Sequence, residues 1–167
     1  MGNEQVSSVR KITITAIFIA LGVLLSPFSI PLGVAKIFPA QHMINVLLAI
    51  FLGWRYSTSA AFCISSLRIT LGMGTILAYP GSMIGAFLSG YLYKKTHSIA
   101  AALLGEIFGT GVLGGFVSYP VALFVLDSHA VAWYFVLAFL PSTITGSILA
   151  YMVYKLLEST KIINFNK

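Results

Sequence analysis

A charge, a proline and three polar side chains stand together in Lys36-Ile37-Phe38-Pro39-Ala40-Gln41-His42-Met43-Ile44-Asn45. Long apolar runs flank this segment on both sides. Polar groups without partners are costly inside a membrane, and those that occur there usually have a function. The segment is therefore either a connector in water or part of the wall of a cavity.

The composition of the whole chain excludes a soluble fold. Of the 167 residues, 58% are hydrophobic and only 8% are charged, whereas soluble domains contain about 25% charged residues. A membrane-spanning helix needs about 20 mainly apolar residues. The charge-free runs and the breakers Pro27, Pro39, Gly72 and Pro80 predict six helices, at about 9–26, 41–54, 57–71, 81–93, 99–126 and 132–157. We expect an all-α membrane protein, a six-transmembrane-helix bundle in which residues 1–167 form a single domain.

The basic residues predict the orientation of this bundle. The net charge is +6, but the basic residues are dispersed among short loops, which does not indicate nucleic-acid binding. Eight of them fall on one side if the N-terminus is inside: Arg10, Lys11, Arg55, Lys94, Lys95, Lys155, Lys161 and Lys167. Since positive residues favour the cytoplasmic side, we expect a multi-pass protein of the cell membrane with both termini cytoplasmic.

Two of the expected outer segments predict a cavity. Residues 30–40 and 72–80 contain proline and are expected to be irregular, and the helices after them look too short to cross the membrane alone. Non-helical backbone at membrane depth survives only where protein buries it or water reaches it. We expect a cavity in the outer half, roofed by these segments. The alternative is that the helix ends are misplaced by a few residues and the loops lie among the lipid headgroups.

Arg68 and Glu106 are the only charged residues expected well inside helices. Their predicted depths differ by about 6 Å, which two long side chains can bridge. A structural Arg68–Glu106 ion pair is one interpretation, and direct contact of one or both with a solute is the other. Both hold if the pair forms the floor of the cavity.

Other polar and aromatic residues are candidates for the same cavity. Gln41 and Asn45 are four residues apart and share a helix face, while His42 projects about 100° away from them. Thr110 shares a face with Glu106 in the same way. Three aromatic residues near the outer boundary either form a membrane-interface belt or stack on a flat heteroaromatic ring: Tyr79, Tyr119 and Trp133.

Small residues recur at four-residue spacing, which lets helix backbones approach closely. The pairs are Ala16/Ala20, Gly81/Gly85, Gly105/Gly109, Gly111/Gly115 and Gly146/Ala150. Most of them should serve packing inside the bundle. Ala16 and Ala20, near the cytoplasmic end of the first helix, are either another packing pair or a docking face for a second membrane protein.

Enzymatic chemistry finds no support in the sequence. The three histidines, His42, His97 and His129, lie in separate segments without nearby thiolates, so we expect no metal site. No nucleophile motif and no phosphate-binding GxxxxGK[ST] loop occur. We predict a protein that is not an enzyme and needs no cofactor, and that takes any energy for transport from a partner or an ion gradient.

Several segments together resemble a known family. They are Ser26-Pro27-Phe28-Ser29-Ile30-Pro31, Val34-Ala35-Lys36, the segment 38–45, Ala78-Tyr79-Pro80-Gly81-Ser82-Met83-Ile84-Gly85-Ala86 and Gly105-Glu106-Ile107-Phe108-Gly109-Thr110-Gly111. The chain resembles, over nearly its whole length, the substrate-capture (S) subunits of energy-coupling-factor vitamin importers, specifically the ThiW type linked to the thiazole precursor of thiamine. The resemblance implies an outward-facing vitamin pocket, docking through Ala16 and Ala20, and partnership with a transmembrane coupling subunit and two ATPase subunits.

The resulting hypothesis is capture of hydroxyethylthiazole from outside the cell. The candidate substrate-binding residues are Lys36, Gln41, His42, Asn45, Arg68, Tyr79, Glu106, Thr110, Tyr119 and Trp133. The phosphate of the thiazole and thiamine itself remain open as ligands. The alternative function is a stand-alone secondary transporter of a small heterocycle, with Glu106 as the proton-coupling carboxylate.

Overall fold

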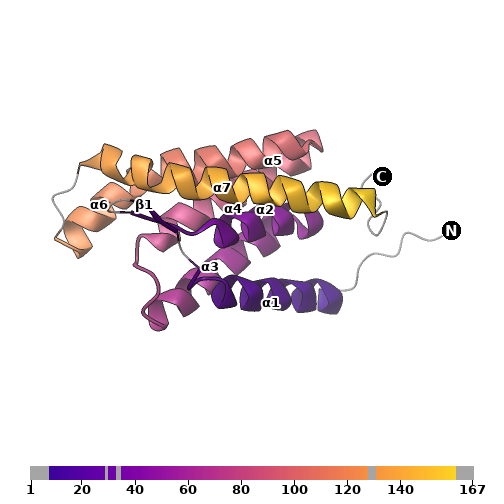
Figure 1. The fold of residues 1–167 in the computed structure, drawn as a ribbon, viewed down its shortest axis with the longest axis horizontal. Helices are drawn as coiled ribbons and strands as arrows, with labels where there is room; N and C mark the ends of the chain where they lie inside the picture. Colours follow the sequence, from indigo (N-terminus) through magenta and orange to yellow (C-terminus); the bar gives the residue numbers. More distant parts are fainter. Residues whose placement is uncertain (1–7, 29, 33–34, 128–130, 161–167) are drawn as a thin grey trace.

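Six continuous helices make up most of the described part of the chain. The computed structural model describes residues 8–28, 30–32, 35–127 and 131–160. The first four helices are α1 (Ser8–Leu24), α2 (Pro39–Leu52), α3 (Trp54–Thr70) and α4 (Ala78–Thr96). A fifth helix runs without a break through α5 (Ile99–Glu106), η1 (Ile107–Gly114) and α6 (Gly115–Val125), and the sixth is α7 (Ala132–Ser159). Figure 1 shows the helices lying roughly along one long axis.

The predicted helices match these elements to within a few residues at most ends. Gly53, at a φ of 88°, joins α2 directly to α3, and this left-handed backbone angle is one that glycine adopts without steric cost. The prediction that the fourth helix begins only after Pro80, at residue 81, was wrong. Helix α4 begins at Ala78, so Pro80 lies in its first turn, where no intrahelical bond needs a backbone N–H. With 19 residues, α4 is also not the short helix that was expected.

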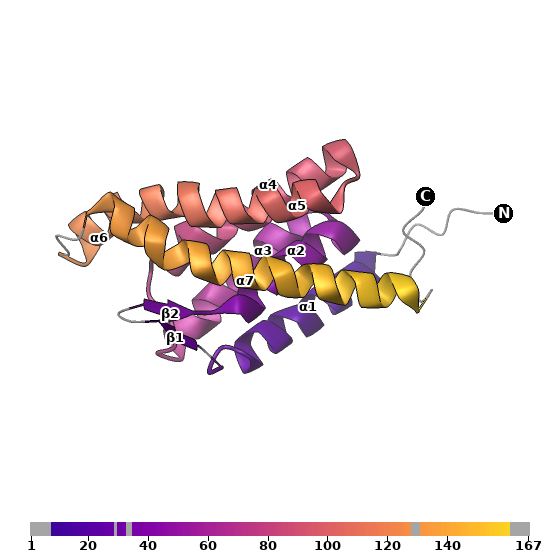
Figure 2. The same cartoon turned by 45° about the horizontal axis from the view of Figure 1, so that its top comes forward.

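The segment before α2 is partly ordered as a β-ribbon, whereas an irregular loop was expected. Strands β1 (Ile30–Leu32) and β2 (Ala35–Ile37) pair antiparallel, with Ile30 opposite Ile37. Just beyond β2, the backbone N–H of Phe38 donates to Oγ of Ser142 in α7 at 3.0 Å. The ribbon therefore lies against the body of the bundle, beside its α7 edge (Figure 2).

Helix α2 forms the centre of the bundle. It contacts α3, α4 and α7, and Val46, Leu48 and Ala49 on it are fully buried. The start of α1 and the end of α7 lie at the same end of the molecule (Figure 1). The first turns of α4 and α7 lie toward the other end, whereas the first turn of α2 lies deeper, where Pro39 and His42 pack against Gly146 in the middle of α7.

Backbone contact between glycines joins α4 to the fifth helix. A Cβ added at Gly109 would lie 2.7 Å from Cα of Gly85, and one at Gly114 would lie 2.8 Å from Cα of Gly81. A Cβ at Gly105 would meet the backbone of Leu88 at 2.8 Å. The prediction that these small residues serve internal packing is confirmed.

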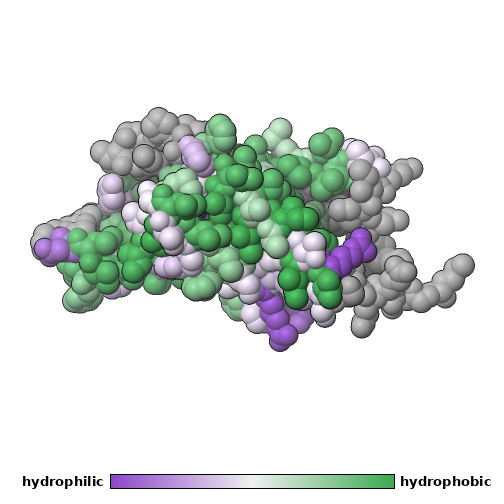
Figure 3. All heavy atoms as spheres, turned by 90° about the horizontal axis from the view of Figure 1, so that it is seen from below, coloured by the Kyte–Doolittle hydropathy of each residue, from purple (hydrophilic) through white to green (hydrophobic). Residues whose placement is uncertain are grey.

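Apolar side chains cover much of the outside of the molecule. Exposed examples are Val9, Ile12 and Leu24 on α1 and Leu137 and Leu156 on α7. Figure 3 shows one face on which apolar atoms cover most of the described surface. Among the described helices, two are long and apolar enough by themselves to cross a membrane, Ile99–Val125 and Ala132–Ser159, while α2 is apolar but shorter. This surface and these helices indicate a membrane protein.

Candidate functional site

A cavity of about 650 Å³ lies beside the first turns of α2 and α4, in the half of the bundle that holds the first turns of α7. Its polar lining comes from Ser26, Gln41, His42, Arg68, Thr75, Ser82, Thr110 and Ser142. Its aromatic lining comes from Phe38, Tyr134, Phe135 and Phe139. The size and the mixed lining match sites that enclose a small organic molecule.

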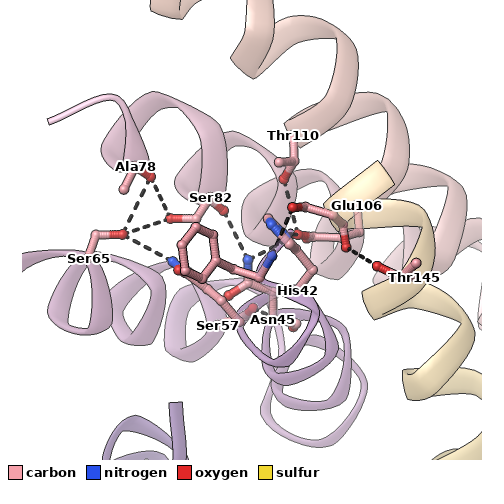
Figure 4. A network of polar contacts seen from close by, with 12 residues as sticks. His42, Asn45, Ser57, Ser65, Ala78, Ser82, Glu106, Thr110 and Thr145 are labelled. Carbon is pink, nitrogen blue, oxygen red and sulfur yellow. Dashed lines mark hydrogen bonds and ion pairs between the residues drawn. The ribbon is translucent and has the colours of Figure 1, made fainter. Parts of the chain in front are cut away.

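Glu106 lies beneath this cavity at the centre of a polar cluster. Its side chain is fully buried, and its Oε1 contacts three polar side chains, two on α2 and one in η1. Nδ1 of His42 lies 2.8 Å away, Nδ2 of Asn45 donates at 3.1 Å, and Oγ1 of Thr110 donates at 3.1 Å. Figure 4 shows these side chains pointing toward one another. Three donors on one oxygen compensate much of the cost of burying a carboxylate.

A chain of hydrogen bonds leads from this cluster to the cavity wall. Nδ2 of Asn45 also donates to the carbonyl oxygen of Ser82 at 3.2 Å, and the hydroxyls of Ser82 and Ser65 lie 3.0 Å apart. Nε2 of Gln41 donates to Oγ of Ser65 at 3.1 Å, while Oε1 of Gln41 accepts from Nη1 of Arg68. The polar residues that the sequence analysis singled out on α2, α3 and the fifth helix therefore form one connected network.

The proposed Arg68–Glu106 ion pair was wrong. The guanidinium of Arg68 donates to Gln41 and, at 3.4 Å, to the carbonyl of Met73, and it lies 4.4 Å from the centre of the Phe38 ring. Glu106 is paired with His42 instead. Counting residues along each helix estimated the depth of both side chains but not their direction, and Arg68 points toward the cavity end rather than toward Glu106.

Local sequence explains why His42 reaches the fifth helix. On α2, Gln41 donates to Ser65 in α3, Asn45 donates both to Ser82 in α4 and to Glu106, and His42 contacts Glu106 from the adjoining face. The other ring nitrogen of His42 has no hydrogen-bond partner among the described residues, and the ring borders the cavity. Because Nδ1 is engaged by Glu106, Nε2 is the ring nitrogen that His42 has available for a ligand.

Two features of the site were missed by the sequence analysis. Residues 107–114 form a π-helix directly after Glu106, an uncommon element that often occurs at functional sites. Gly85 is the second, because a Cβ there would lie 2.0 Å from Oγ1 of Thr110 and 2.9 Å from Oε2 of Glu106. The four-residue glycine spacing indicated close packing at Gly85 but not that a carboxylate fills the space.

The predicted aromatic cluster does not form over the cavity. The hydroxyl of Tyr79 lies 3.0 Å from Oγ of Ser66, and its ring lies beside Phe62. Trp133 is 64% exposed and packs edge-on against Phe116, and Tyr119 is also exposed. None of Tyr79, Tyr119 and Trp133 lines the cavity. The aromatic residues that do line it, Phe135 and Phe139 among them, had no polar signal in the sequence that could single them out.

The remaining candidates lie apart from the cavity or outside the described residues. The backbone of Lys36 pairs with Pro31 in the ribbon, while its side chain lies outside the described part of the structure. Ala16 and Ala20 are exposed on α1. The described residues contain no group of three His, Cys, Asp or Glu side chains that could hold a metal ion. His129 lies outside the described residues.

Comparison with known proteins places the chain in a family. No curated protein matches it. A family model described as "Thiamine-precursor transporter protein (ThiW)" matches residues 12–160, which include every described helix of the bundle in whole or in large part. This match confirms the resemblance that the proline-containing segments and the glycine motifs indicated. The chain belongs to the ThiW family of thiamine-precursor transporters.

Proposed function

We propose that this chain is the substrate-capture (S) subunit of an energy-coupling-factor importer that takes up the hydroxyethylthiazole precursor of thiamine. The observation that supports this most is the cavity of about 650 Å³ built over the buried Glu106 network. A ligand cavity at one end of a membrane bundle suits a protein that captures a solute from one side. No reaction on the ligand is part of the proposal.

The proposal includes six membrane spans with both termini cytoplasmic. Basic residues support this orientation, because Arg55 begins α3, Lys94 ends α4 and Lys155 lies near the end of α7. The cavity lies at the opposite ends of these helices, near Arg68 and Ser82. Since positive residues favour the cytoplasmic side, the cavity faces outward.

The ligand occupies the cavity between aromatic and polar walls. Phe139 and Tyr134 offer ring faces for a thiazole, and Gln41 and His42 offer polar atoms for its ring nitrogen and hydroxyl. Glu106, Asn45 and Thr110 act mainly from behind, by fixing the ring of His42. The exposed Trp133 has no part in this proposal.

Energy for import comes from a transmembrane coupling subunit and its two ATPase subunits. Ala16 and Ala20 lie on one exposed face of α1, flanked by exposed apolar residues such as Ile12 and Ile17. Small side chains on an apolar face allow another membrane helix to approach closely. This face is the proposed docking surface for the coupling subunit.

Two measurements on the full chain test the proposal. Isothermal titration with detergent-purified protein is expected to show hydroxyethylthiazole binding, and affinity purification from its native membrane is expected to recover a coupling subunit and ATPases. The variant Ala16→Trp/Ala20→Trp is expected to lose these partners while it keeps ligand binding. Leu149→Trp, at an exposed position of α7, is the matched control and is expected to keep both. Wild-type protein that binds no thiazole, or that purifies alone, contradicts the proposal.

A second candidate is a stand-alone proton-coupled transporter of the same ligand. The contact between the buried Glu106 and His42 favours it, because two titratable groups 2.8 Å apart can hold and pass a proton. It predicts uptake into cells or vesicles that lack any coupling subunit, and loss of that uptake when a protonophore is added.

A further inference from the structure

Arg68 is a buried cation in the wall of the cavity. Only 4% of its surface is exposed, and that residue borders the cavity beside Met73 and Phe38. Its Nε has no hydrogen-bond partner among the described residues. Its Nη2 makes one long bond, of 3.4 Å, to the carbonyl of Met73. One edge of the guanidinium, formed by Nε and Nη2, can therefore donate hydrogen bonds to a stronger acceptor.

No carboxylate of the described residues balances this charge. Glu106 is held by His42, Glu158 pairs with Lys155 at 2.7 Å, and Asp127 is exposed beyond the end of α6. Inside a membrane protein a buried charge normally pairs with an opposite charge, because leaving it unpaired is energetically unfavourable. Arg68 therefore lacks the partner that its position requires.

The contacts that Arg68 does make are too weak to replace a counter-ion. Gln41 offers a neutral amide oxygen, and the Phe38 ring offers a cation–π contact at 4.4 Å. Gln41 is itself fixed by its bond to Ser65, which keeps its oxygen turned toward Arg68. These contacts orient the guanidinium without neutralising it.

The cavity lining has the same charge asymmetry. Its lining residues include Arg68 and the ionisable ring of His42 but neither aspartate nor glutamate. An enclosed site with one fixed positive charge and low-dielectric walls favours an anion over a neutral molecule of the same shape.

We propose that the cavity takes its ligand as an anion, with Arg68 as the counter-ion, and that it binds a phosphate monoester of the thiazole alcohol more tightly than the free alcohol. The free Nε–Nη2 edge matches the geometry of two phosphate oxygens, which a guanidinium binds with two parallel hydrogen bonds. The aromatic residues Phe139 and Tyr134 remain available for the ring. This inference rests on the proposed function for the identity of the ring, but not for the preference for an anion.

The test compares three probes on the full chain in a phosphate-free maltoside detergent: hydroxyethylthiazole, its phosphate monoester, and methyl phosphate, which has no ring. Isothermal titration is expected to give a dissociation constant at least about tenfold lower for the ester than for the alcohol. Arg68→Gln is expected to make the two dissociation constants nearly equal. Arg68→Lys keeps the positive charge but loses the two parallel N–H donors, and it is expected to keep part of the preference for the ester. Arg55→Gln removes an equal charge at the opposite end of α3 and is expected to leave the preference unchanged.

The outcomes separate this inference from the proposed function. Tighter or equal binding of the alcohol to wild-type protein overturns the inference and leaves the proposed function standing. Binding of methyl phosphate that depends on Arg68, without binding of either thiazole, supports the preference for an anion with Arg68 as its counter-ion and contradicts the proposed function and the identity of the ring. An ester preference that survives in Arg68→Gln overturns the inference. If phosphatidylglycerol in mixed micelles displaces the phosphate ester, the anion that Arg68 binds is a lipid headgroup. That result would also overturn the inference. Circular dichroism establishes whether each variant is folded. If Arg68→Gln does not fold, the comparison of the ester with the alcohol on wild-type protein still decides the inference.

Discussion

Nδ1 of His42 lies 2.8 Å from Oε1 of Glu106, although 64 positions separate the two residues in the chain. This contact joins α2 to the fifth helix directly beneath the cavity. It also fixes the orientation of the His42 ring, because Nδ1 is engaged by the buried carboxyl group. The ring that borders the cavity is thus oriented by a side chain that the ligand does not need to touch.

Replacing Glu106 with glutamine is expected to weaken both the fold and the site. The glutamine side chain has the same shape, but it lacks the charge of the carboxylate whose Oε1 accepts three hydrogen bonds. We expect this loss to lower stability by about 1–3 kcal/mol. Thiazole affinity is expected to fall about tenfold, because His42 loses its fixed orientation. Titration calorimetry and unfolding in sodium dodecyl sulfate measure the two effects. Glu158→Gln, at the exposed end of α7, is the control, and an unchanged affinity in Glu106→Gln would rule out this role.

Asn45→Ala is expected to act in the same direction through a different loss. Nδ2 of Asn45 donates both to Glu106 and to the carbonyl of Ser82, and both acceptors are buried. Removal of the donor leaves them without this bond, which is expected to cost about 1–3 kcal/mol. The same two measurements apply, and affinity is again expected to fall about tenfold. A variant that binds as tightly as wild type would show that the network behind His42 does not control the ligand site.

Gly85→Ala is expected to destabilise the protein more than Gly74→Ala does. A Cβ at Gly85 would lie 2.0 Å from Oγ1 of Thr110, so Thr110 or the backbone must move. Overpacking of this kind costs about 1–3 kcal/mol. At Gly74, which lines the cavity, the nearest atom to an added Cβ is 3.5 Å away. Equal apparent melting temperatures for the two variants would contradict the close packing of α4 on the fifth helix.

Phe139→Leu is expected to weaken thiazole binding about tenfold, whereas Trp133→Leu is expected to leave it nearly unchanged. Phe139 lines the cavity, and Trp133 is largely exposed outside it. Both changes replace an aromatic ring with an apolar side chain, so they form a matched pair. The opposite ranking by calorimetry would restore the aromatic set inferred from sequence and move the ring site away from the cavity.

Cysteine labelling tests which end of the bundle faces outward. In a Cys63→Ala background, Thr75→Cys beside the cavity and Thr96→Cys at the far end of α4 are both at exposed positions. A membrane-impermeant maleimide is expected to label the first in intact cells and the second only after permeabilisation, because the positive end faces the cytoplasm. The reverse pattern would invert the orientation and make the cavity cytoplasmic.

The sequence was sufficient for the helices and for much of the polar set, but not for its pairing. Runs without charge and the positions of Pro27, Pro39 and Gly72 located the six helices, because in so apolar a chain only charges and backbone breakers interrupt them. The four-residue spacing of Gln41 and Asn45 correctly predicted that both side chains lie on one face of α2, where they join the same hydrogen-bond network. The partner of Glu106 could not be derived in this way, since residue counting gives depth along a helix but not how neighbouring helices are rotated about their axes.

Two backbone features also lay beyond sequence reasoning. The pairing of Ile30–Leu32 with Ala35–Ile37 involves strands too short to show an alternating pattern. The π-helix at Ile107–Gly114 differs from an α-helix by its hydrogen-bond step, and its glycine-rich sequence is equally compatible with ordinary close packing. Tertiary contacts select both features.

The glycine contacts between α4 and the fifth helix limit where the protein can open. Contacts at three levels, through Gly81, Gly85 and Gly105, bring the two backbones together, and the buried side chains of Glu106 and Thr110 fill the space at Gly85. If one helix slid past the other, their backbone atoms would clash. We therefore expect the two helices to move together as one rigid body. A bound cargo is then expected to leave by displacement of the opposite wall, which Ser26, Pro27 and the turn 71–77 provide. We expect any hinge motion to occur in those segments, so that a cross-link between them traps a bound cargo inside.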